Sequence, residues 1–181
     1  MANTALGRPT MIDWSAILRV YGPHVWRTAF RLLNQDTDAS DCFQRTFLSA
    51  VELAGKETVR NWPAVLRRLA TSRALEILRT RYRHRSEPLP EEIADRVRYD
   101  PLDDAAHCEL AESLRTALAE IDPIQSSAFC LIGLEGMSNR EAADQLGVTA
   151  NHVGVLLHRA RQALREKLIA FDPTITRREK P

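Results

Sequence analysis

Cysteine is scarce in this chain, and its spacing shows no recognisable chemistry. The three cysteines, Cys42, Cys108 and Cys130, lie far apart and form no CxxC pair. This spacing predicts neither a disulfide framework nor a zinc site, and the apolar neighbours of the three residues indicate buried, reduced thiols. His107 is adjacent to Cys108 rather than at the helical spacing that chelation would need. We therefore expect no metal and no cofactor.

Long apolar runs are also lacking. No run approaches the roughly 20 residues that a membrane-spanning helix needs, and the first residues lack the apolar core of a signal peptide. The sequence shows no nucleophile–base pair, phosphate-binding loop or metal cluster. We therefore expect a protein that is not an enzyme, is not inserted in a membrane and stays in the cytoplasm.

Aromatic residues are few, at 6% of the chain, whereas Leu, Ala and Arg are abundant. These three residue types lose little free energy on entering a helix, and apolar positions recur at helical spacing almost throughout. A break or a bend is expected at Gly22–His24, between the first two expected helices. The expected helices are Trp14 to about Tyr21, about His24 to Leu33, a helix capped by Asp36 or Thr37 that ends at about Leu53, Trp62 to beyond Leu78, about Leu102 to Ile121, Pro123 to Gly136, and a final pair within Ser138–Leu168.

The segment Ser86–Asp104 interrupts this periodicity with three prolines and a high density of charge. Such a composition is typical of a linker. The expected fold class is therefore all-α, with two small helical domains joined by a flexible acidic linker. The expected boundaries are residues 1–85 for the first domain, 86–104 for the linker, 105–171 for the second domain and 172–181 for a tail.

The net charge of +1 conceals two blocks of opposite sign. Acidic residues dominate from Glu87 to Asp122, whereas basic residues dominate the stretch before it, where only Glu57 and Glu76 oppose them. The basic residues are Lys56, Arg60, Arg67, Arg68, Arg73, Arg79, Arg81, Arg83 and Arg85. A basic block of this kind can neutralise the phosphates of a nucleic acid.

The stretch "SNREAADQLGVTANHVGVLLHRARQALREKL" has the pattern of a helix-turn-helix. Ser138 and Glu141 form the S-x-x-E of a capping box, which satisfies free N–H groups at a helix start. Gly147 suits a sharp turn with a left-handed backbone, and Thr149 can cap the second helix. An apolar stripe then runs along that helix through Val153, Leu157, Ala160, Leu164 and Leu168.

The other face of the second helix is polar and basic, with Asn151, His152, His158, Arg159, Gln162 and Arg165. Two interpretations follow from the residues. One is a DNA-binding helix-turn-helix whose second helix enters a major groove, and the other is a helical hairpin with a solvated basic face.

The combination of segments resembles the sigma-70 family of RNA polymerase sigma factors, in its extracytoplasmic-function form. "GLEGMSNREAADQLGVTANHVGVLLHRARQALREKL" is similar to region 4 of that family. "DASDCFQRTFLSA" resembles the region 2 helix that docks on polymerase, and "LRRLATSRALEILRTRYRHR" resembles the promoter-melting helix with its basic end. The resemblance extends over roughly Ala16–Leu168, in the family's order.

The resemblance implies a non-catalytic subunit that binds core RNA polymerase and directs promoter recognition. It assigns polymerase docking to Asp36, Asp38, Asp41, Gln44 and Phe47. Without the family, the acidic residues fit equally well a solvated helix start whose acids compensate the helix dipole. It assigns −10 recognition and melting to Arg60, Asn61, Trp62, Arg67, Arg68, Arg73, Arg79, Arg81 and Arg83. It assigns −35 recognition to Arg140, Thr149, Asn151, His152, Val155, His158, Arg159 and Arg161. The implied partners are core RNA polymerase, double-stranded and melted promoter DNA, and an anti-sigma factor or another regulator.

The chain departs from the family pattern at several positions. These departures argue against the family's usual promoter sequence more than against membership of the family. The recognition helix of the family usually carries Lys-Ser-Arg where this chain has Gly154, Val155 and Leu156. Glu usually stands at the positions of Ser40 and Arg45, and Asn and Asp at those of Ser72 and Glu76. Because Gly154 and Val155 have no side-chain hydrogen-bond donor, base readout is expected to fall on Asn151 and His152.

Two other functions remain open from the sequence. A simple helix-turn-helix regulator would use the first domain for a ligand or a dimer contact, although such a domain has no need of a basic, melting-type helix. A sigma-like decoy would bind regulators without starting transcription, and the altered recognition helix motivates that interpretation.

Overall fold

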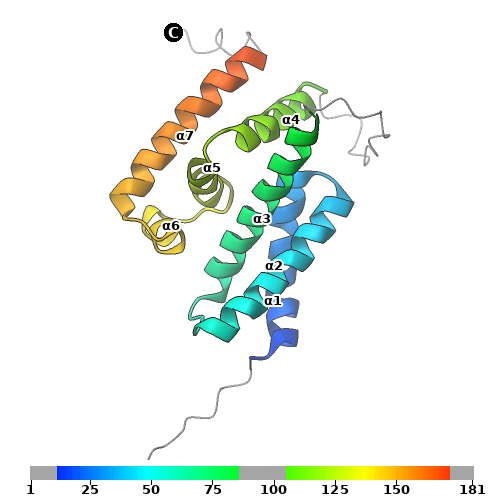
Figure 1. Ribbon diagram of the computed structural model, residues 1–181, viewed down its shortest axis with the longest axis vertical. Helices are drawn as coiled ribbons and strands as arrows, with labels where there is room; N and C mark the ends of the chain where they lie inside the picture. The colour runs from blue at the N-terminus through cyan, green and yellow to red at the C-terminus, as the bar shows by residue number, and fades with distance from the viewer. Residues whose placement is uncertain (1–11, 86–104, 172–181) are drawn as a thin grey trace, which may run out of the picture.

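A computed structural model describes residues 12–85 and 105–171, and in these two ranges the chain is built of helices (Figure 1). The expected all-α class is confirmed. The expected linker, residues 86–104, and the expected tail, residues 172–181, lie outside the described residues. We refer to residues 12–85 as the first half and to residues 105–171 as the second half. Within them, no helix is both long and apolar enough to cross a membrane.

The first half consists of α1 (Trp14–Leu33), α2 (Asp36–Lys56) and α3 (Trp62–Arg85). Of the break or bend expected at Gly22–His24, the break is wrong, because α1 continues through Pro23. A proline inside a helix removes one backbone hydrogen bond. Pro23 is exposed, so water can satisfy the carbonyl that is left without a partner. Gly22 is buried beside Phe43 of α2, and packing on both sides of this point outweighs the local penalty.

The start and the end of α2 also differ from expectation. Neither Asp36 nor Thr37 caps the helix, because the N-cap is Gln35, whose side chain makes no capping hydrogen bond. Asp36 and Asp38 instead lie in the first turn, where a negative charge opposes the helix dipole. The helix continues past Leu53 to Lys56, so the loop before α3 is shorter than expected.

The second half consists of α4 (Ala105–Glu120), α5 (Pro123–Phe129), the π-helical turn η1 (Cys130–Leu134), α6 (Asn139–Leu146) and α7 (Ala150–Phe171). Asp122 caps α5 by accepting from the backbone N–H groups of Ile124 and Gln125, at 3.0 and 3.2 Å. The chain is helical from Pro123 to Leu134, and the left-handed Gly136 follows, as expected, but after Phe129 the helix widens into η1. The two buried residues of η1, Cys130 and Leu131, pack into different hydrophobic clusters, and this packing on two sides accompanies the wider turn.

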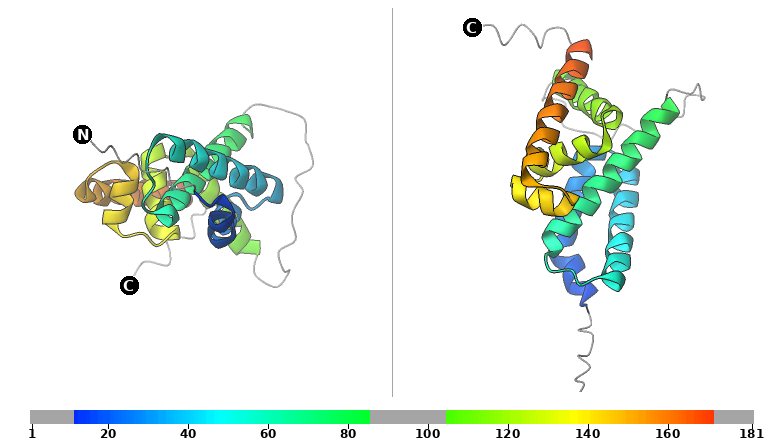
Figure 2. Two further views of the ribbon diagram at one scale, coloured as in Figure 1. Left: turned by 90° about the horizontal axis from the view of Figure 1, so that it is seen from below. Right: turned by 60° about the vertical axis from the view of Figure 1, so that its left-hand side comes forward.

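Helix α3 has α1 and α2 on one side and α4 to α7 of the second half on the other (Figures 1 and 2). A hydrophobic cluster, which we call the shared core, contains buried residues of both halves. From the first half it takes Ala29, Leu32, Leu33, Ala39, Cys42, Ala74, Leu75 and Leu78, and from the second half Ala117, Leu118, Ile121, Cys130, Ala160 and Leu164. The two halves of this structure are therefore packed against each other.

The cysteines follow the expectation of buried, reduced thiols at two positions only. Cys42 and Cys130 are buried, whereas Cys108 is exposed, so the expectation for Cys108 is wrong. Burial raises the pKa of the Cys42 thiol to about 11 and that of Cys130 to about 12. Because the thiolate is the reactive form, both buried thiols are almost entirely inert at neutral pH.

A maleimide reagent at pH 7 should therefore modify the folded chain once, at Cys108, and label Cys42 and Cys130 only after unfolding. A thiol with a pKa of about 11 is about one ten-thousandth thiolate at pH 7, and burial hinders access further. Mass spectrometry of the native and the denatured protein measures both states. Rapid native labelling of a Cys108→Ser variant would contradict the packing of the shared core.

Candidate nucleic-acid interface

Local hydrogen bonds build the helix-turn-helix as the sequence predicts. The Ser138 hydroxyl accepts from the Glu141 backbone N–H at 3.2 Å, and the Glu141 carboxylate accepts from the Ser138 backbone N–H at 2.8 Å. These bonds with Ser138 lower the pKa of Glu141. Gly147 has φ of 67°, a left-handed conformation that ends α6. The Thr149 hydroxyl accepts from the His152 backbone N–H at 3.2 Å at the start of α7.

A small hydrophobic cluster holds the two helices of the motif together. It contains Ala142 and Ala143 of α6 and Val153 of α7, with Val148 of the turn packed against it. Leu156 of α7 is also buried, so it lies on the same side of the helix as the apolar stripe. The inner face of α7 is therefore occupied by packing, and only its outer face is available for a ligand.

The outer face of the motif holds the residues that the sequence assigns to the −35 element. All of them are exposed, namely Arg140, Thr149, Asn151, His152, Val155, His158, Arg159 and Arg161. Asn151 and His152 lie in the first turn of α7, the end that enters a major groove in such motifs. Neither Arg140 nor Arg159 makes an ion pair with any residue that the structure describes. This arrangement leaves a polar and basic face free to approach DNA.

The residues that the sequence assigns to the −10 element are placed less uniformly. Arg60, Asn61 and Arg83 are exposed, whereas Trp62, Arg67, Arg68, Arg73, Arg79 and Arg81 are half-buried. The Asn61 side chain caps α3 by accepting from the Ala64 backbone N–H at 3.2 Å. Trp62 packs edge-on against Trp14 with ring centroids 5.2 Å apart. Its ring therefore contributes to the core of the first half.

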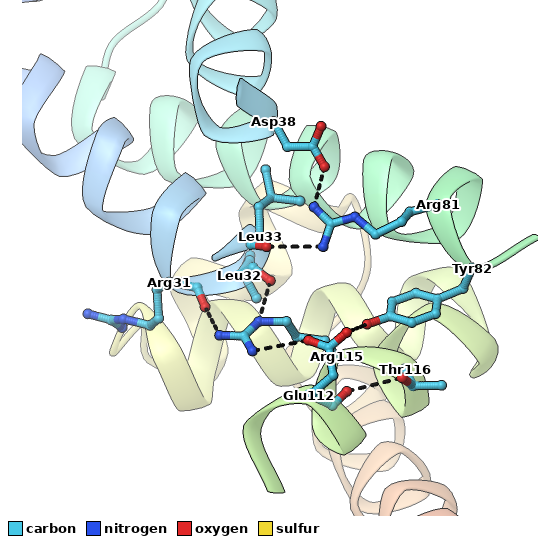
Figure 3. Close-up of polar contacts among 9 residues, drawn as sticks. All are labelled: Arg31, Leu32, Leu33, Asp38, Arg81, Tyr82, Glu112, Arg115 and Thr116. Carbon is cyan, nitrogen blue, oxygen red and sulfur yellow. Dashed lines mark hydrogen bonds and ion pairs between the residues drawn. The ribbon is translucent and has the colours of Figure 1, made fainter. Parts of the chain in front are cut away.

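Several arginines of α3 make contacts inside the protein. Arg73 donates to Ser49 at 2.9 Å and to Glu76 at 2.7 Å. Arg81 pairs with Asp38 and donates to the Leu33 carbonyl at 3.1 Å (Figure 3). In this structure neither guanidinium is free of intramolecular contacts.

Arg79 reaches from the first half to the second, where it donates to the Ser126 hydroxyl at 2.6 Å. Its Nε is buried without a hydrogen-bond partner. A buried polar group without a partner costs about 1–3 kcal/mol. Burial also lowers the pKa of the Arg79 guanidinium. Its position is therefore favourable only because the surrounding contacts compensate for this cost.

The polymerase-docking residues that the sequence assigns lie on α2, and the structure adds two more candidates. Phe47 is half-buried against the core of the first half, while Asp41 is half-buried in an ion pair with Arg45. By contrast, Leu48 and Val51 are 64% and 48% exposed. Exposed apolar side chains rimmed by polar residues are typical of interaction surfaces.

Helical periodicity could have identified these two residues. The inward face of α2 consists of small residues, Ala39, Cys42, Thr46 and Ala50. The opposite face carries Asp41, Gln44, Leu48 and Val51, at spacings of three and four residues that form one stripe. We refer to these four residues as the α2 stripe. Leu48 and Val51 do not stand out in the sequence as docking residues, because large apolar side chains are usually buried.

The described residues hold no cluster of His, Cys, Asp or Glu that could bind a metal ion. The candidate site consists of the exposed face of the helix-turn-helix, the basic helix α3 and the α2 stripe.

The sequence is similar to those of known proteins. Residues 111–164 match the family model "Sigma-70, region 4". The extracytoplasmic-function (ECF) RNA polymerase sigma factor SigE of Mycolicibacterium smegmatis is 33% identical over 161 residues, which cover 87% of this chain and 62% of the relative. The RNA polymerase sigma-E factor of Streptomyces coelicolor is 32% identical over 167 residues, which cover 90% of this chain and 89% of the relative.

The fold has a counterpart among solved structures. The sigma factor RpoE from Bartonella quintana, solved in complex with the anti-sigma factor NepR, aligns with a TM-score of 0.55 at 22% identity. The alignment covers 88% of this chain and 98% of that protein. The sequence similarity extends over both halves and nearly the full length of the Streptomyces relative. This chain therefore belongs to the sigma-70 family of RNA polymerase sigma factors, in its extracytoplasmic-function group.

Proposed function

We propose that this chain binds core RNA polymerase and directs promoter-specific initiation of transcription. The observation that supports this most directly is the capped helix-turn-helix with its exposed polar face, which follows a basic helix in the same order as in the family. In this role the second half reads the −35 element and the basic α3 contacts the −10 element. The role places the protein with the polymerase in the cytoplasm.

The experiment that tests the proposal is run-off transcription with purified core polymerase over a pool of promoter fragments. Added chain should yield transcripts from a subset of the pool, whereas core polymerase alone should not. Binding to regulators without transcripts would favour the decoy. DNA binding without binding to core polymerase would favour a simple helix-turn-helix regulator.

Polymerase docking is proposed to fall on the α2 stripe. Leu48→Glu should weaken binding to core polymerase by about 30-fold, which corresponds to about 2 kcal/mol, because a charge would replace an apolar contact in the interface. Helicity should not change, since Leu48 is 64% exposed. A titration of labelled chain with core polymerase measures the affinity.

A matched control is available on another helix. Leu110 of α4 is also an exposed leucine, at 45%, and lies outside the α2 stripe. Leu110→Glu should leave the affinity for core polymerase unchanged. If both substitutions weakened binding equally, or if neither weakened it, the docking surface would not lie on α2.

An anti-sigma factor is the proposed type of regulator. Support comes from the fold, since the similar Bartonella sigma factor was solved with the anti-sigma factor NepR. Such a regulator would compete with core polymerase or hold the two halves in one arrangement.

A further inference from the structure

An exposed valine lies on the outer face of α7. Val155 is 48% exposed, whereas the neighbouring Val153, Leu156 and Leu157 are buried. Two residues of α-helix turn a side chain by about 200° around the axis, so Val155 points away from the side on which Val153 is packed. The two methyl groups of Val155 therefore lie on the face that is available to a ligand.

The neighbours of Val155 on this face are polar. Residues three and four positions apart lie on the same face of a helix. For Val155 these residues are Asn151, His152, His158 and Arg159, and all four are exposed. A small apolar group is thus placed between hydrogen-bonding and basic side chains, at the centre of the proposed reading face.

No side chain flanks Val155 at position 154. A Cβ atom on Gly154 would meet no atom within 4 Å, so packing within the protein does not require a glycine there. Glycine in the interior of a helix also lowers helix stability relative to alanine. The missing side chain leaves space in which the edge of a base can approach Val155.

The charges and the chemistry of this face indicate what Val155 contacts. Arg140 and Arg159 form no ion pair with any residue in the ranges 12–85 and 105–171, and such cations are suited to DNA phosphates. Among the base edges in the major groove, thymine presents an apolar group, its C5 methyl. Because a valine side chain makes no hydrogen bond, this methyl is the part of a base edge that matches it.

We propose that Val155 reads the C5 methyl of a thymine in the −35 element, an inference that rests on the proposed function as a sigma factor. Asn151 and Val155 are four residues apart, or about 6 Å along the helix axis. This distance is less than two base-pair steps of about 3.4 Å each. The thymine therefore lies within about two base pairs of the base that Asn151 contacts, and Val155 adds an apolar contact to the hydrogen bonds of Asn151.

Replacement of thymine by deoxyuridine tests this contact. The full chain first selects a preferred duplex from a pool in which the −35 element is randomised. Each thymine of the selected element is then replaced singly by deoxyuridine, which keeps the base pairing and the O4 acceptor but lacks the C5 methyl. Fluorescence anisotropy measures the affinity of the chain for each duplex.

Deoxyuridine at one position should weaken binding of the unmodified chain by about fourfold, which corresponds to about 0.8 kcal/mol, because one buried methyl contact is lost. In Val155→Ala the same replacement should have no effect, since the side chain that contacts the methyl is absent. The matched control is Val20→Ala. Val20 lies on α1 and is 54% exposed, so this variant should keep the fourfold difference.

The outcomes separate the methyl contact from the proposed function. If no deoxyuridine weakened binding of the unmodified chain, or if the loss persisted in Val155→Ala, Val155 would not read a methyl, and the proposed −35 recognition would stand. If the unmodified chain bound the selected duplex and a scrambled duplex equally, the proposed −35 recognition would itself be wrong, and the methyl contact with it.

Discussion

Leu118→Ala is expected to lower the free energy of unfolding by about 3 kcal/mol, within the range of about 2–5 kcal/mol for buried leucines. Leu118 is 1% exposed and lies in the shared core. All three tryptophans, Trp14, Trp26 and Trp62, belong to the first half, whereas Leu118 belongs to the second. Urea unfolding followed by tryptophan fluorescence therefore reports on the half that is not mutated.

If the halves form one core, the fluorescence transition should shift to lower urea together with the transition followed by circular dichroism. Leu66 lies in the cluster confined to the first half. Leu66→Ala should therefore lower the urea midpoint of the fluorescence transition whether or not the halves share a core, and it shows that the fluorescence is sensitive to such a change. An unchanged fluorescence midpoint in Leu118→Ala would mean that the halves unfold independently.

Asn151→Ala is expected to weaken binding to the preferred −35 element by about 1–3 kcal/mol, the usual value of a good bidentate base contact. Binding to a scrambled duplex should change much less, so that sequence preference relaxes. Val155 and Gly154 offer no side-chain donor, which leaves Asn151 and His152 as the polar residues in the first turn of α7. Electrophoretic binding assays with the full chain on matched and scrambled duplexes measure both affinities.

Arg159→Ala should instead weaken binding to both duplexes alike and reduce the salt dependence, since a phosphate contact positions the protein without reading sequence. Gln162→Ala is the matched amide control. Gln162 lies eleven residues, or about 16 Å, farther along α7, and its side chain donates to Glu166. An equal loss in Asn151→Ala and Gln162→Ala would show that Asn151 does not read a base.

The signals that the sequence predicted correctly are local. The capping box of Ser138 and Glu141, the left-handed Gly147 and the Thr149 cap each depend on atoms within four residues of one another. The Asp122-Pro123 start of α5 is of the same kind. For this reason the helix-turn-helix and its exposed polar face could be predicted from the amino-acid sequence.

The expectations that failed depend on packing between distant segments. Pro23 does not end α1, because contacts with α2 and α3 extend along both sides of it. The exposure of Leu48 and Val51 on α2 also depends on packing, because small residues such as Ala39 and Ala50 form the buried face of that helix. The pattern of apolar residues in one sequence does not show whether a helix continues through a proline or which of its apolar residues are buried.

The amino-acid sequence by itself determined the all-helical class, the helix-turn-helix and the family, because helix propensity, caps and turn glycines act over a few residues. Only the tertiary structure decided that α3 packs against the second half and that its arginines bind Asp38, Leu33 and Ser126. The physical reason is separation along the chain. Arg115 and the Leu32 carbonyl lie 83 positions apart, and their contact exists only because burial of the shared core brings the two helices together.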